Sequence, residues 1–215
     1  MNKLKMKVML TILGLAAAQS ASAYNITLGG TSVAGHGLFS SVPGAVTTTF
    51  DSGVLPSNYT GGAVVTGSSG GQFASPPDDA TAYFTVGGSV PNAPSPGAVT
   101  FGFLASYFGF YGGSPDTYNG LQFFNGETLV KTITGAEIAN PIPANGDQSK
   151  GYYFNITATN SSEYFDSVHF LSSSAAFETD NHAVLAAVPE PETYAMMMAG
   201  LSVMGFVARR RKSVK

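Results

Sequence analysis

Apolar and polar residues alternate along several parts of the chain with a period of two. In residues 151–158, the side chains of Tyr152, Phe154 and Ile156 alternate with more polar neighbours. A period of two places successive side chains on opposite faces of a sheet, so this segment is predicted to be a half-buried strand. Shorter apolar and β-branched runs predict further strands at 25–28, 46–50, 63–65, 80–86, 99–104, 164–171 and 175–185.

A β-hairpin is the strongest local prediction. Residues 121–124 and 127–133 are rich in apolar, aromatic and β-branched side chains, and Asn125-Gly126 separates them. Asn-Gly accepts the positive φ values of a type I′ turn, whose twist matches that of a two-stranded ribbon. With about eight to ten strands and no helix between them, we expect an all-β fold. An antiparallel β-sandwich fits this pattern, with a jelly roll as the first choice of topology.

The N-terminal 23 residues do not follow the strand pattern. Three lysines are followed by an apolar stretch and then by Ala21-Ser22-Ala23. Small residues at both ends of that triplet suit cleavage by signal peptidase, so residues 1–23 are predicted to be a signal peptide. The mature chain then begins at Tyr24, and the β domain spans 24–188.

The C-terminal segment, 189–215, has three parts in a fixed order. Pro189, Glu190 and Pro191 predict an extended segment, because proline fixes φ and lacks an N–H group. An uncharged apolar run then predicts a transmembrane helix at about 193–208, which at about 24 Å is shorter than a typical hydrocarbon core. The four cations that follow are expected to stop translocation and stay on the cytoplasmic side of the membrane. These cations are Arg209, Arg210, Arg211 and Lys212.

This order resembles the PEP-CTERM sorting signal of Gram-negative bacteria that make exopolysaccharide. The resemblance implies recognition by an exosortase, a membrane cysteine protease, and cleavage near Pro189-Glu190-Pro191. The protein would be anchored in the inner membrane only transiently, and then reach the cell surface or the extracellular matrix of a biofilm. A permanent single-pass anchor is the alternative.

A second resemblance concerns the β domain itself. Residues 107–119, the hairpin after them and residues 176–183 are similar to blocks in a family of exosortase-dependent bacterial surface proteins. That family has no assigned catalytic activity, so the resemblance implies a surface protein without implying a reaction.

The predicted β domain is strongly acidic. Lys131 and Lys150 are its only lysines or arginines, against eleven acidic residues, so its net charge is about −9 while the whole chain carries −3. A surface of this sign repels phosphate backbones, so we expect no nucleic-acid partner. The chain has no cysteine and therefore no disulfide. Carboxylates without cationic partners favour hydration or a hard cation such as calcium.

Three acidic residues are candidate calcium ligands. Asp116, Glu178 and Asp180 would meet if the fold brought a mid-chain loop beside the last strand. The alternative is that Asp116 caps a turn and that Asp180 shapes a bend.

Aromatic residues gather between positions 107 and 118. At a period of two, half of them must point into the core. Tyr111 and Tyr118 are expected to be the most exposed, and their rings could stack on the sugars of an exopolysaccharide.

Catalytic motifs are weak. Ser69 lies in a Gly-x-Ser-x-Gly pattern, but Pro76-Pro77 follows where the serine hydrolase motif needs a helix. The three histidines have no metal-binding spacing. We therefore expect a secreted, non-enzymatic surface or matrix protein that is a substrate of exosortase. A carbohydrate-binding module is the alternative, and a hydrolase is the third hypothesis.

Overall fold

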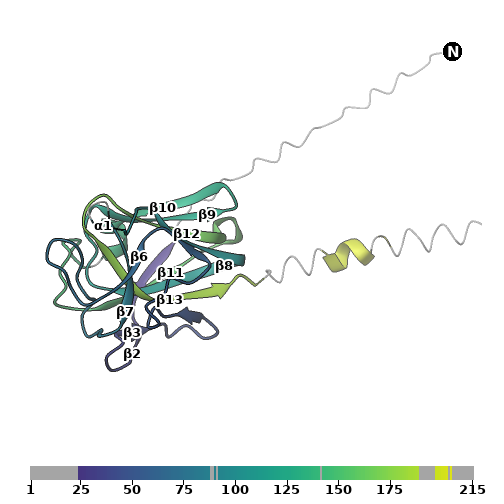
Figure 1. Ribbon diagram of the computed structural model, residues 1–215. Helices are drawn as coiled ribbons and strands as arrows, with labels where there is room; N and C mark the ends of the chain where they lie inside the picture. Colours follow the sequence, from purple (N-terminus) through teal and green to yellow (C-terminus); the bar gives the residue numbers. More distant parts are fainter. Residues whose placement is uncertain are drawn as a thin grey trace, which may run out of the picture.

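The computed structural model describes residues 24–87, 90, 92–140, 142–188, 197–202 and 204. Strands dominate the domain, with α1 at one edge (Figure 1). The strands are β1 (Asn25–Leu28), β2 (Thr31–Ser32), β3 (Leu38–Phe39), β4 (Val46–Thr48), β5 (Tyr59–Thr60), β6 (Ala63–Thr66), β7 (Ala82–Val86), β8 (Gly97–Gly112), β9 (Asn119–Asn125), β10 (Thr128–Thr134), β11 (Tyr152–Thr157), β12 (Phe165–Ser172) and β13 (Phe177–Ala186). Two short helices, α1 (Gly135–Ala139) and the 3₁₀ helix η1 (Ser161–Glu163), lie between them.

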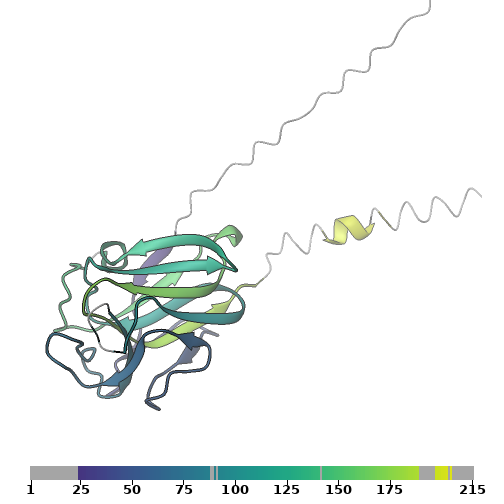
Figure 2. The ribbon, with the colours of Figure 1, turned by 45° about the horizontal axis from the view of Figure 1, so that its top comes forward.

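Eleven of these strands form one antiparallel sheet. Its main path runs β10-β9-β12-β8-β13-β7-β6, while β1, β4, β5 and β11 pair at its sides. The long strand β8 pairs with β12 along its first residues and with β11 and β13 along its last. Figure 2 shows how the long strands follow one another around the domain. Because the two halves of β8 have different neighbours, the sheet curls and encloses a core.

Phenylalanine side chains from many parts of the sheet meet in this core. Phe170 of β12 has its ring centroid 5.9 Å from that of Phe108 in β8 and 5.4 Å from that of Phe84 in β7. His182 of β13 stacks on Phe170 at 4.9 Å. All four side chains are buried, so these contacts join β7, β8, β12 and β13.

Strands β9 and β10 form the predicted hairpin, but its turn differs from the prediction. Thr128 pairs with Asn125, so the two loop residues are Gly126 and Glu127. Gly126 has a φ of +56°, whereas neither Asn125 nor Glu127 has a positive φ. A type I′ turn needs positive φ at both loop positions, and a type II′ turn needs it only at the first. The predicted type I′ turn is therefore wrong.

Strand β11 is buried on both faces, whereas its alternation predicted a half-buried strand. Tyr153 and Phe154, which point to opposite faces, are both fully buried. Leu38, Val42 and Ala45 pack against the cluster that contains Tyr153. The segment around β3 thus covers the face of the sheet that the alternation in β11 predicted to be exposed to solvent.

The all-β antiparallel class is confirmed, and the expected absence of helices is wrong at α1. The Thr134 side chain accepts a hydrogen bond from the Glu137 N–H, and the Glu137 carboxylate accepts one from the Thr134 N–H at 2.8 Å. This capping box is visible in the sequence as Thr-x-x-Glu. One curled sheet does not by itself establish a jelly roll, which stays a prediction.

The last strand ends next to the C-terminal segment. After β13, the Ala187 N–H donates to the Leu104 carbonyl at 2.8 Å. Residues 1–23, 189–191 and 209–212 lie outside the described residues, and 197–202 are helical. Among the residues that the structure describes, we find no helix with the length and apolar character needed to cross a membrane. The transmembrane helix at 193–208 therefore stays a prediction.

Candidate functional site

A pocket of about 350 Å³ opens where four loops meet at the ends of the strands. The loops connect β6 to β7, β8 to β9, α1 to β11 and β12 to β13. The lining residues are Ser68, Ser69, Gly70, Gly71, Gln72, Phe73, Ala74, Asp116, Tyr118, Gly146, Gln148, Ala175, Ala176 and Glu178. Three candidate residues from the sequence, Asp116, Tyr118 and Glu178, therefore line the same pocket.

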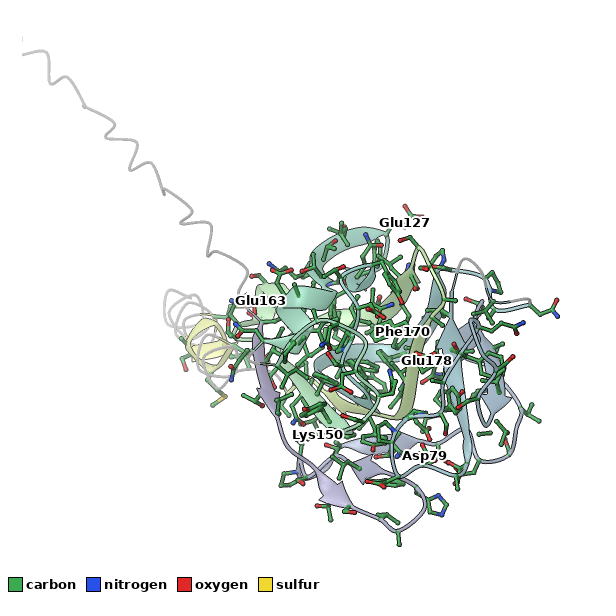
Figure 3. The ribbon with its side chains drawn as sticks, turned by 90° about the vertical axis from the view of Figure 1, so that its left-hand side faces the viewer. Asp79, Glu127, Lys150, Glu163, Phe170 and Glu178 are labelled. Carbon is green, nitrogen blue, oxygen red and sulfur yellow. The ribbon has the colours of Figure 1, made fainter. Side chains whose placement is uncertain are left out.

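Glu178 supplies a largely buried carboxyl group to this pocket. It is the second residue of β13, which is held there by pairing with β7, and its side chain is 8% exposed. Its Oε1 accepts a hydrogen bond from the Ala74 N–H at 2.8 Å, which joins the β6–β7 loop to the strand. Figure 3 labels Glu178 beside this strand.

Tyr118 and Asp116 come from the loop between β8 and β9. The Tyr118 hydroxyl donates to the Ala175 carbonyl at 3.0 Å. Buried Asn119 orders this loop, because its Oδ1 accepts from the Asp116 N–H at 2.6 Å and its Nδ2 donates to the Ala176 carbonyl at 3.2 Å. The position of Asp116 thus depends on an asparagine that the sequence analysis did not single out.

The α1–β11 loop closes the pocket beside Asp116. Gly146 has a φ of +66°, and a Cβ atom there would stand 2.5 Å from Asp116 Oδ2, so this close approach requires glycine. Gln148 comes from the same loop, and its Oε1 is buried and accepts no hydrogen bond from any described residue. Gln148 lines the pocket, and no motif in the sequence pointed to it.

Electrostatic coupling links the three candidate side chains. Burial, with the negative charge of Asp116 as a further cause, raises the pKa of Glu178 to about 7, although the bond from Ala74 opposes the rise. Burial, and then the hydrogen bond and charge of Asp116, raise the pKa of Tyr118. Near pH 7 the pocket therefore offers hydrogen-bond acceptors, a carboxyl group that is partly protonated and a phenol. This set suits the hydroxyl groups of a sugar.

The expected exposure of Tyr111 is wrong. Tyr111 is 1% exposed, and its hydroxyl donates to the Pro77 carbonyl. Gly37 lies so close to the ring that a Cβ atom there would overlap it. Tyr111 faces the side of the sheet that the segment around β3 covers, so its ring cannot stack on a sugar.

The three-carboxylate calcium site is also wrong. Among the described residues, no group of three or more histidine or acidic side chains is arranged to hold a metal ion. Asp116 and Glu178 share the pocket, but Asp180 contacts the Thr81 hydroxyl instead, on another part of the domain. The reason is that β13 leaves β7 after Thr179 and joins β8 at Asp180, where Asn181 has a φ of +50°.

Residues 187–212 match the family model described as the PEP-CTERM protein-sorting motif. The chain carries a PEP-CTERM sorting motif. No curated protein and no solved structure gave a significant match to the chain.

A PEP-CTERM motif implies a sorting signal that an exosortase recognises, and with it an exported protein of a Gram-negative bacterium. The match contains Pro189, Glu190 and Pro191 as well as the basic cluster 209–212. It begins at Ala187, one residue after β13 ends at Ala186. The PEP-CTERM motif therefore starts where the folded domain stops.

Proposed function

We propose that the chain is an exported, non-enzymatic surface or matrix protein whose β domain is delivered by exosortase processing. The observation that carries the proposal is the PEP-CTERM motif at 187–212, which follows directly on the last strand. Cleavage near Pro189 would leave every ladder of the sheet intact, because the last paired residue is Ala186. The sorting signal is then separable from the protein that it delivers.

The composition of the domain supports an extracellular role. Its net charge of about −9 favours solubility and disfavours binding to phosphate polymers or to anionic membranes.

Ser69 lines the pocket, but none of the three histidines is among the described residues that line it. A serine nucleophile with a histidine base is therefore not assembled there.

The experiment replaces Pro189, Glu190 and Pro191 together by alanine and follows the protein in an exopolysaccharide-producing host that has an exosortase. We expect the wild-type chain outside the cells in a shortened form, and the variant uncut in the inner membrane. The same chain in a host without exosortase is the matched control and should behave as the variant does. Equal shortening and export of the variant would refute the proposal.

The pocket favours a second candidate function, the binding of a carbohydrate such as the host's exopolysaccharide. Its support is the combination of the Gln148 side-chain amide, the Tyr118 phenol and the two carboxyl groups of Asp116 and Glu178, all of which line the pocket. Protein sites for sugars need such directional polar groups beside an aromatic ring.

A polysaccharide pull-down with Gln148→Ala and Glu178→Gln tests this second function. We expect roughly tenfold weaker binding for each, since one hydrogen bond to a charged or buried group contributes about 1.5 kcal/mol. Glu127→Gln is the control, because Glu127 is exposed at the hairpin turn, far from Glu178 in Figure 3. Binding unchanged in both pocket variants would remove this candidate. Turnover of a glycoside that Glu178→Gln abolishes would replace it by a hydrolase.

A further inference from the structure

A second pair of carboxylates lies apart from the pocket, between the loop that precedes β7 and the middle of β13. Asp79 belongs to the loop and is 8% exposed, while Asp180 belongs to β13 and is fully buried. The Thr81 hydroxyl lies between them, 2.6 Å from Asp79 Oδ1 and 3.5 Å from Asp180 Oδ2. Figure 3 shows Asp79 beside the purple N-terminal strands.

In each carboxylate, Oδ1 accepts a good hydrogen bond from the backbone, whereas Oδ2 does not. Asp79 Oδ1 accepts from the Thr81 N–H at 2.9 Å, and Asp180 Oδ1 accepts from the Asn181 N–H at 2.6 Å. Asp79 Oδ2 is buried and accepts no hydrogen bond from an N–H or alcohol O–H group of the described residues. Asp180 Oδ2 has the long contact with Thr81. A buried carboxylate oxygen without a donor is costly, so this arrangement calls for a positive charge or a proton.

In the part of the chain that the structure describes, no lysine or arginine forms an ion pair with Asp79 or Asp180. The two lysines of the domain act on other carboxylates, Lys131 on Glu137 and Lys150 on Asp147. In the described part of the chain, one ion pair involves a carboxylate, His36 with Asp51 at 3.4 Å.

Further negative charge surrounds the pair. The charge of Asp51 acts on Asp180, and the charges of Asp78, Asp79 and Asp180 all act on the Tyr111 phenol. Burial, and next the hydrogen bond shared with the Asp79 carboxyl, raise the pKa of Asp180 to about 9. One shared proton would neutralise one of four neighbouring aspartates, whereas a divalent cation would neutralise two.

We propose that Asp79 and Asp180 bind a calcium ion, with Asp79 Oδ2 and Asp180 Oδ2 as its carboxylate ligands. Calcium takes six to eight oxygen ligands, and the Thr81 hydroxyl, backbone carbonyls and water can complete such a shell around two carboxylates. Two carboxylates are a sparse set, which is typical of extracellular sites that bind calcium at about 0.1–1 mM. The site does not include the pocket residues and does not depend on the carbohydrate function.

The position of the pair indicates what the ion does. The Asn181 side chain donates to the His36 carbonyl at 2.6 Å, and the Ala80 N–H donates to the Gly35 carbonyl at 3.0 Å. The loop before β7, the bend of β13 and the segment before β3 are therefore already joined around Asp79 and Asp180. A cation there would lock these three segments together and stabilise the fold.

The test uses the full chain in mild detergent, stripped with a chelator, with calcium chloride and terbium chloride as probes. At a calcium concentration of about 100 times Kd, we expect the unfolding midpoint to rise by roughly 5–11 °C. Terbium should give luminescence on tyrosine excitation, because Tyr59, Tyr83 and Tyr111 each feel the charge of Asp79 or Asp180. Calcium should quench this signal by competition.

Asp79→Asn and Asp180→Asn decide between a cation and a shared proton. Both variants keep the shape of the side chain and remove a negative charge, so they should fold without calcium at least as well as the wild type. Each should lose the calcium shift and the terbium signal. Asp147→Asn and Glu178→Gln should keep both responses, since Asp147 is exposed and Glu178 lies in the pocket.

Either of two results would overturn the proposal. The first is no calcium shift and no terbium signal up to about 10 mM, well above the range of extracellular calcium sites. If the unfolding free energy also falls as the pH rises, the two carboxyl groups share a proton instead of binding a cation. The second is a calcium response that survives both aspartate substitutions, which would place the ion elsewhere.

Discussion

Replacing Phe170 by alanine tests whether the curled sheet closes around one core. Phe170 is fully buried and lies against the rings of Phe84, Phe108, Phe177 and His182. A buried Phe→Ala change costs about 3–5 kcal/mol, out of the 5–15 kcal/mol typical of a domain. At about 2–4 °C per kcal/mol for a domain of this size, the unfolding midpoint should fall by roughly 6–20 °C.

The assay is thermal and guanidinium unfolding of the full chain, followed by far-UV circular dichroism and tyrosine fluorescence, since the chain has no tryptophan. Phe103→Ala is the matched control, because Phe103 is 45% exposed on β8 and its loss should cost about 1 kcal/mol or less. Equal losses for the two variants would contradict the closure of the core around Phe170.

Three further substitutions test individual parts of the fold. Burial lowers the pKa of His182 to about 3, so the wild type loses stability as the pH falls below about 6.5, by about 2 kcal/mol at pH 5. The unfolding free energy of the wild type minus that of His182→Phe should decrease by about 2 kcal/mol from pH 8 to pH 5, because the variant has no histidine to protonate at this position. A difference that does not change with pH would contradict a neutral buried histidine. Thr134→Ala should cost about 1 kcal/mol in denaturant unfolding because it removes the cap of α1; no loss would mean that the cap is not formed in solution. Gly37→Ala should cost more than about 1 kcal/mol, because φ is +69° and the new methyl group would overlap the Tyr111 ring; an unchanged midpoint would show that the segment is not packed there.

The parts of the fold that the sequence predicts are those with a strong local pattern. Apolar residues recur with a period of two in β11 and in the paired segments β9 and β10. All three segments form strands. The C-terminal motif is equally local, because its proline pair, apolar run and cations follow one another directly. Such features depend little on the rest of the molecule.

The errors arise where distant segments meet. The segment around β3 is rich in Gly and Ser and has no clear period, so the sequence did not predict that it covers β11 and buries Tyr111. The separation of Asp180 from Glu178 depends on a change of partner strand within β13, which no local pattern indicates. The pocket has the same origin, because four loops far apart in the chain form it.

Mass spectrometry of the extracellular protein shows whether the C-terminal signal is removed from the exported β domain. We expect a chain that begins at Tyr24 and has lost the residues after about Pro189, including the basic cluster 209–212. An extracellular protein that still ends at Lys215 would contradict it.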